Sequence, residues 1–236
     1  FKNRAKCLDV RPQYYILWSR KPQKSIIMKK SIHYLVLCFC LLFALPLTSM
    51  AQVHVGASEY STVKAAFDAI NAGTHTGAIT ITLSGSTSES TQAQLNASGS
   101  GSASYTSITM YPTAAGVNIS GSISGSIIYL YGADNVTIDG RVNQSGNMNM
   151  TIENSSTSTS ACALYFNYDA CNNTITYVDI KASTGSNNTN PDSGTRGVIF
   201  FGSSTSAVGQ DNNTISYCNI GPSGSNLPNI GIFSYG

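Results

Sequence analysis

Asp139 and Arg141 are the two residues of this 236-residue chain whose types and spacing come nearest to catalysis. An acid and a base on one short outward stretch can move a proton, but the same pair more often forms an ordinary surface ion pair. Gly140 between them interrupts the alternation of a strand, and no second or third acid stands beside them. We therefore expect a surface ion pair, and keep Asp139 and Arg141 as the candidate catalytic residues.

Glycoside hydrolysis requires two carboxyl groups about 5 to 10 Å apart that face one sugar. Asp134 and Asp139 are the nearest pair, with Glu153 behind them. If Val136 and Ile138 point inward, Asp139 points outward and Asp134 lies at a bend. The two acids then belong to different faces, and a role in turns and caps is the expectation.

Several other functions lack the residues they need. Residues 52–236 carry four basic and ten acidic residues, which excludes the phosphate-neutralising surface of a nucleic-acid binder. His54 and His75 have no zinc-ligand spacing to cysteine or acid, and neither a Gly-x-Ser-x-Gly elbow nor a phosphate-binding loop is present. Binding through aromatic side chains remains, with Tyr131, Tyr177 and Tyr217 as candidates that could stack on sugar rings.

The basic front of the chain has the three parts of a secretory signal peptide. Met28-Lys29-Lys30 is the positive start, residues 34–47 form an apolar run, and Ser49-Met50-Ala51 is a cleavage site. The run of 14 residues is shorter than the roughly 20 that span a bilayer, so no permanent membrane span is expected. We assign 28–51 to the signal peptide and 1–27 to an upstream segment that is untranslated or disordered.

One helix precedes a long region of short strands. Tyr60, Val63, Phe67 and Ile70 recur at helical spacing, with Ser61 as the expected N-cap, and we assign residues 52–75 to an N-terminal cap. From Ile79 onward, apolar alternations are separated by clusters of Gly, Ser, Thr and Asn, which is typical of strands and turns.

An internal repeat is the clearest signal in residues 76–236. Four apolar-aromatic segments begin at Ile128, Leu164, Ile199 and Ile232, at offsets of 36, 35 and 33 residues. A second element recurs after the first three, and a third follows it, so that each repeat carries about three short strands. Stacked repeats of this kind predict an all-β parallel solenoid.

Asn135, Asn172 and Asn212 occupy the same place in successive repeats. Asparagine tolerates the left-handed backbone of a tight bend, and its side-chain amide can bond its neighbour in the next coil. We interpret the three as a structural ladder. Cys162, Cys171 and Cys218 are too few for a disulfide framework, and buried thiols are favoured over a bridge between the first two.

The order of the helix at 62–70, the strand at 77–81 and the stretch Asn135–Gly140 resembles right-handed parallel β-helix proteins of the pectin-lyase-like superfamily. More narrowly, it is similar to large secreted surface proteins that some bacteria export by type IX secretion. The resemblance covers about residues 53–236 and implies a capping helix, a carboxy-terminal sorting or adhesion domain, and either adhesion or polysaccharide cleavage. In a lyase of this superfamily, Arg141 would be the base, and acids such as Asp139 would bind calcium.

Together these observations predict a secreted or surface-displayed right-handed β-helix that is truncated at its carboxy-terminus. We expect a monomer that contacts a polysaccharide or cell-surface glycan, without a required cofactor. A polysaccharide lyase or glycoside hydrolase with active coils beyond residue 236, and a purely structural stalk, are the alternatives.

Overall fold

The computed structural model describes residues 52–185, 196–203 and 209–235. The segments assigned above to an upstream region and a signal peptide, 1–27 and 28–51, lie outside these residues. Within the described ranges the fold is all-β, with one α-helix, α2 (Val63–Asn71), and one short 3-10 turn, η1 (Val142–Gln144). None of the helical segments described there has the length and hydropathy that crossing a membrane requires.

The strands form three sheets, each with its own order of neighbours. The first sheet contains β2 (Ser58–Tyr60), β1 (Val53–Val55), β3 (Thr76–Leu83), β6 (Ser104–Pro112), β9 (Val136–Asp139), β12 (Thr174–Thr176) and β15 (Thr214–Ser216). The second contains β4 (Thr87–Glu89), β7 (Val117–Gly121), β10 (Met150–Asn154), β13 (Val178–Ala182) and β16 (Asn219–Pro222). The third contains β5 (Ala93–Asn96), β8 (Ser126–Tyr131), β11 (Cys162–Asn167), β14 (Ile199–Phe201) and β17 (Ile232–Ser234).

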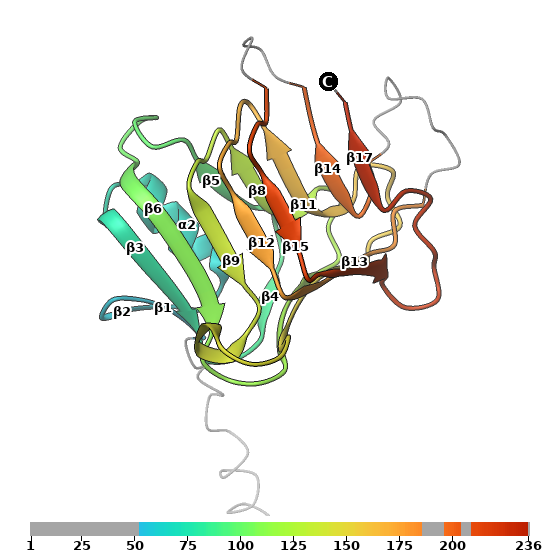
Figure 1. Ribbon diagram of the computed structural model, residues 1–236, viewed down its shortest axis with the longest axis horizontal. Helices are drawn as coiled ribbons and strands as arrows, with labels where there is room; N and C mark the ends of the chain where they lie inside the picture. The colour runs from blue at the N-terminus through green and yellow to red at the C-terminus, as the bar shows by residue number, and fades with distance from the viewer. Residues whose placement is uncertain (1–51, 186–195, 204–208, 236) are drawn as a thin grey trace, which may run out of the picture. The chain divides into compact units, whose positions relative to one another are not determined.

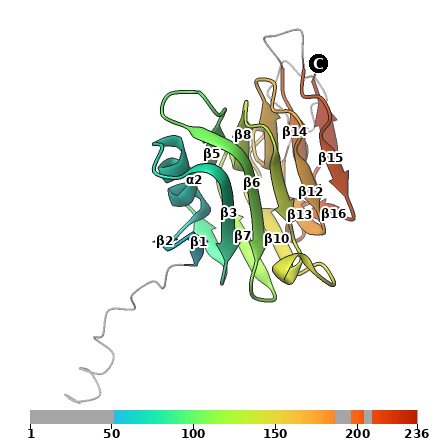
Figure 2. The same cartoon turned by 60° about the vertical axis from the view of Figure 1, so that its left-hand side comes forward.

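From β3 onward, consecutive strands join the first, second and third sheets in turn (Figure 1). Each strand pairs in parallel with the strand three positions later, so that three consecutive strands form one repeat (Figure 2). The expected register is confirmed, because Leu164 pairs with both Ile128 and Ile199. The described residues contain five such repeats. The first begins at β3, before the four segments that were aligned from the sequence.

The core consists of apolar rows from each of the three sheets, which run across the strands. Alternation along each strand places every second side chain on the inner face. One inward row of the first sheet is Ile81, Met110, Ile138, Ile175 and Ile215. The first four of these side chains are buried, whereas Ile215, on the last strand of that sheet, is only half-buried against the core.

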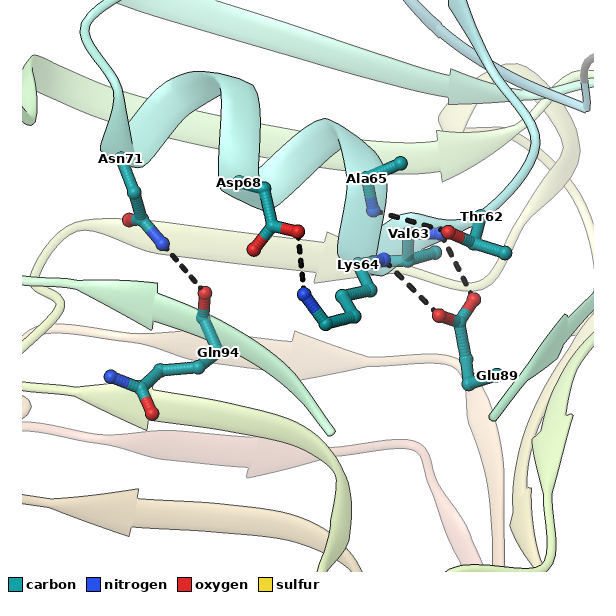
Figure 3. A network of polar contacts seen from close by, with 8 residues as sticks. All are labelled: Thr62, Val63, Lys64, Ala65, Asp68, Asn71, Glu89 and Gln94. Carbon is teal, nitrogen blue, oxygen red and sulfur yellow. Dashed lines mark hydrogen bonds and ion pairs between the residues drawn. The ribbon is translucent and has the colours of Figure 1, made fainter. Parts of the chain in front are cut away.

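The α2 helix covers the first edges of the second and third sheets (Figure 3). Thr62, and not Ser61, is the N-cap, because its hydroxyl accepts the backbone N–H of Ala65 at 3.1 Å. At the other end, the Asn71 side chain donates to the Gln94 carbonyl and accepts the Asn96 N–H, both at 2.9 Å. These two bonds satisfy the free backbone of β5, which is a sheet edge.

The three cysteines in the described residues are free thiols, as expected. Cys162 and Cys171 are buried, and Cys218 is half-buried against the core. Burial raises the pKa of the Cys162 thiol to about 12, so this group stays protonated near neutrality.

Candidate functional site

The candidate pair Asp139 and Arg141 forms a close ion pair at the end of β9. The Arg141 Nη2 atom donates to Asp139 Oδ2 at 2.6 Å, and Arg141 Nε donates to Asp139 Oδ1 at 3.0 Å. The backbone N–H of Arg141 donates to the same Oδ1 atom at 3.0 Å. The Asp139 side chain is only 4% exposed, so the pair is not the fully exposed ion pair that the sequence suggested.

In the last two repeats the chain turns from the first sheet to the second within one or two residues. The turn begins at a tyrosine with left-handed backbone, Tyr177 at φ 54° and Tyr217 at φ 54°. After β9 the connection is longer, from residue 140 to residue 149. Gly140 is the equivalent residue after β9. A Cβ atom at Gly140 would collide with the Tyr177 carbonyl oxygen, so only glycine allows this approach of the two backbones.

This corner brings together two groups of residues that the sequence treated separately. The Arg141 guanidinium lies over the Tyr177 ring, with its carbon 4.3 Å from the ring centroid. The Tyr177 and Tyr217 rings stack with centroids 4.8 Å apart and planes within 12°. Arg141, Tyr177 and Tyr217 therefore form one column, which we call the corner stack, and Tyr217 at its end is 72% exposed.

The charge of the corner stack is largely neutralised. Hydrogen bonding to Asp139 raises the pKa of Arg141, which keeps the guanidinium protonated. A proton-abstracting arginine would need a lowered pKa. The arrangement therefore supports contact and stacking better than proton transfer.

Asp134 has a partner of its own, as the sequence predicted for a turn or cap residue. Its Oδ1 atom accepts the backbone N–H of Cys171 at 2.7 Å, and burial raises the pKa of its carboxyl group. The carboxylate of Asp139 is instead directed at Arg141. These partners give each acid a structural role in the fold.

Tyr131, the remaining tyrosine candidate, lies on the third sheet and not at the corner stack. Its ring is 4.3 Å from that of Tyr168 and 5.5 Å from that of Tyr129, measured between centroids. Tyr129 begins a row of rings across four strands, which is continued by Tyr165, Phe200 and Phe233. The sequence analysis aligned these strands but did not identify the aromatic row. The row could have been found from the sequence, because its rings occupy the same position in each of the four aligned segments.

The two roles predicted for the asparagine row, a left-handed bend and a hydrogen bond between repeats, belong to two neighbouring positions. Asn135, Asn172 and Asn212 all have left-handed backbone, at φ 59°, 57° and 55°. The side-chain amide that joins successive repeats, however, belongs to the next residue. Asn173 Oδ1 accepts the Val136 N–H at 2.9 Å, and Asn213 Oδ1 accepts the Asn173 N–H at 3.0 Å.

The residues present do not fit the calcium ion that the lyase resemblance implies. In the part of the chain that the structure describes, no group of three or more His, Cys, Asp or Glu side chains could hold a metal ion. Asp139, the acid suggested for that role, directs both carboxylate oxygens at Arg141. Calcium sites generally need several oxygen ligands, and a single carboxylate that is already bonded to Arg141 does not supply them.

The fold and the corner stack define an all-β protein with parallel strands and an aromatic, charge-paired corner. A scan of protein-family models gives no match for the chain, and searches of curated proteins and of solved structures give none either.

Proposed function

We propose that this chain is a right-handed parallel β-helix of the pectin-lyase-like class, secreted or displayed on a cell surface by type IX export, which contacts a glycan. From β3 onward, the parallel pairing of strands three positions apart supports the β-helix. Such a fold presents flat outer faces with regularly spaced side chains, a geometry that suits a polymer with a repeating unit.

The corner stack is the observation that carries the glycan proposal. A sugar ring packs its apolar face on an aromatic ring, while its hydroxyl groups bond to polar neighbours. The Tyr217 ring is mostly exposed, and it stacks on the Tyr177 ring. Arg141 packs on the other ring of the pair, Tyr177, so the contacts that orient the Tyr217 ring are in place before any ligand arrives.

Contact without cleavage is the form of this function that the site supports best. Asp139 accepts hydrogen bonds from Arg141 on both carboxylate oxygens. A general acid or base must be able to exchange its proton with a substrate, which this pairing opposes. An adhesin or a glycan-contacting scaffold therefore fits the residues better than a lyase or a hydrolase.

Retention on insoluble polysaccharides tests the proposal. The purified chain, its Tyr217→Ala variant and its Tyr235→Ala variant are applied to a panel of neutral, acidic and amino polysaccharides. Tyr235 is the matched control, because it is also exposed but lies after β17, away from the corner stack.

We expect retention on at least one polysaccharide, weakened about tenfold or more by Tyr217→Ala and unchanged by Tyr235→Ala. Retention on none of the panel would favour a structural stalk. Release of soluble oligosaccharides from the panel would favour the enzyme and overturn the non-catalytic proposal.

A further inference from the structure

A second candidate binding site is a polar groove on the outer face of the second sheet, away from the corner stack. It has a volume of about 380 Å³ and lies over β4, β7 and β10. Its polar lining consists of Ser88, Asn118, Ser120, Ser122, Glu153 and Ser155. No aromatic ring lines it, so stacking is not its mode of binding.

Strand register brings the lining together. Ser88 pairs with Ser120, and Ser120 pairs with Glu153, so these three side chains lie next to one another across three strands. Ile119 and Ile152, which alternate with them, are fully buried in the core. The alternation therefore directs the serines and the glutamate to the outer face.

Asn118, in the wall of this groove, carries a buried acceptor without a partner. Its Nδ2 atom donates to Glu153 Oε2 at 3.1 Å, while its Oδ1 atom is buried and has no hydrogen-bond partner within the described structure. The opposite amide orientation would turn the carbonyl oxygen toward the Glu153 carboxylate, which is repulsive. A buried carbonyl without a partner is costly, so a donor that the Asn118 carbonyl can reach by a small rotation of its side chain is favoured.

Glu153 adds a negative charge that has no close ion pair of its own among the described residues, although it interacts electrostatically with Lys181, its register partner on β13. Its Oε1 atom accepts the Ser223 hydroxyl at 2.7 Å, and its Oε2 atom accepts Asn118. Lys181, on the next strand, is paired with Asp179 at 2.7 Å. The groove therefore combines a carboxylate, a free amide oxygen and serine hydroxyls, and it is rich in acceptors.

We infer that this groove binds a primary ammonium group carried on a polar body, the chemistry of an amino sugar. An ammonium group has three donors and no acceptor, which matches Glu153, Asn118 Oδ1 and a serine hydroxyl. A neutral sugar can donate its hydroxyl groups to the same acceptors, but only a cation also gains from the negative charge of Glu153. The choice of an amino sugar over a lysine side chain rests on the proposed glycan function, whereas the preference for an amine does not.

Calorimetric titration of the purified chain tests this inference with three probes. A glucosamine tetramer carries free amines, an N-acetylglucosamine tetramer has the same backbone with the amines blocked, and Nα-acetyl-lysine amide offers the amine without a sugar. The variants are Glu153→Gln, Asn118→Leu and, as a control for the loss of one negative charge, Glu59→Gln. Glu59 lies on β2, away from the groove.

We expect the glucosamine tetramer to bind at least about tenfold more tightly than the acetylated tetramer, and Glu153→Gln to remove that preference. Asn118→Leu should weaken binding, and Glu59→Gln should leave it unchanged. Equal binding of both tetramers, or an unchanged preference in a folded Glu153→Gln variant, would overturn the inference.

Two further outcomes separate this inference from the proposed function. Lysine amide that binds as tightly as the glucosamine tetramer would reject the amino sugar while keeping the amine site. Glucosamine binding that survives Tyr217→Ala but not Glu153→Gln would support the groove independently of the corner stack.

Discussion

The carboxylate of Glu89 accepts the backbone N–H of Val63 at 2.9 Å, although one residue ends β4 and the other begins α2. Its second oxygen accepts the N–H of Lys64 at 3.1 Å. The first N–H groups of a helix have no partner within the helix, and they favour a negative charge. One buried side chain therefore fixes the helix over the edge of the second sheet.

Glu89→Ala should destabilise the protein by about 2 to 4 kcal/mol, because it leaves one buried and one part-buried helix N–H group without an acceptor. Chemical denaturation followed by circular dichroism measures this loss. Lys64→Ala is the control, since it removes only an exposed ion pair with Asp68, worth about 0.5 kcal/mol or less. Similar losses in the two variants would show that Glu89 does not anchor the helix.

Asn173 and Asn172 should respond differently to substitution, although they are neighbours. Asn173 is fully buried, and its amide bonds Val136 N–H and the Ala133 carbonyl. Asn173→Ala should cost about 2 to 4 kcal/mol because both backbone groups lose their partner. Asn172→Gly should cost less than about 1 kcal/mol, because the residue is exposed and glycine accepts its left-handed backbone. Thermal unfolding compares the two, and equal midpoints would contradict this division of roles.

Gly140→Ala should disturb the corner stack. The added methyl group meets the Tyr177 carbonyl oxygen, a backbone atom that cannot move away without shifting the bend. We expect a loss of about 2 kcal/mol or more and a change in the near-ultraviolet tyrosine signal. Gly221→Ala on β16 is the control, because a Cβ atom there meets nothing within 4 Å. An unaltered tyrosine signal in Gly140→Ala would show that the bend tolerates a side chain.

Alkaline pH should destabilise the fold through Cys162. Burial raises the pKa of this thiol from 9.0 to about 12, so above pH 9 the unfolded chain releases a proton that the folded chain keeps. The contribution to stability is therefore complete below pH 9 and is lost as the pH rises toward 12, at about 1.4 kcal/mol per pH unit. Urea unfolding between pH 8 and pH 10 should give a shallower pH slope for Cys162→Ala than for the parent chain. Parallel slopes would assign the alkaline loss to other groups.

Much of the fold could be predicted because the repeat is visible in the alternation of apolar and polar residues. Offsets between Ile128, Leu164, Ile199 and Ile232 gave the correct pairing of four strands. The first repeat escaped notice because β5, Ala93–Asn96, lacks the aromatic residues of its successors. The helix was placed correctly, but its N-cap was predicted one residue early, because Ser61 and Thr62 are equally suitable by type.

The candidate residues were harder to place, because most of them lie at bends. Alternation predicts the face of a side chain only along a strand. Tyr177 and Tyr217 interrupt it with left-handed backbone, and Arg141 follows a glycine into η1. The sequence therefore named the members of the corner stack without indicating that they meet.

The sequence by itself determined the three-strand repeat, its register and the inward rows of isoleucine, because period-2 alternation and equal spacing are local properties. Only the tertiary structure decided which amide, Asn172 or Asn173, reaches the next repeat, and that Arg141 covers Tyr177. Both depend on the direction in which the backbone leaves a bend. That direction is set by contacts between residues about 36 to 40 positions apart, such as Val136 with Asn173 and Asn173 with Asn213, which no local pattern records.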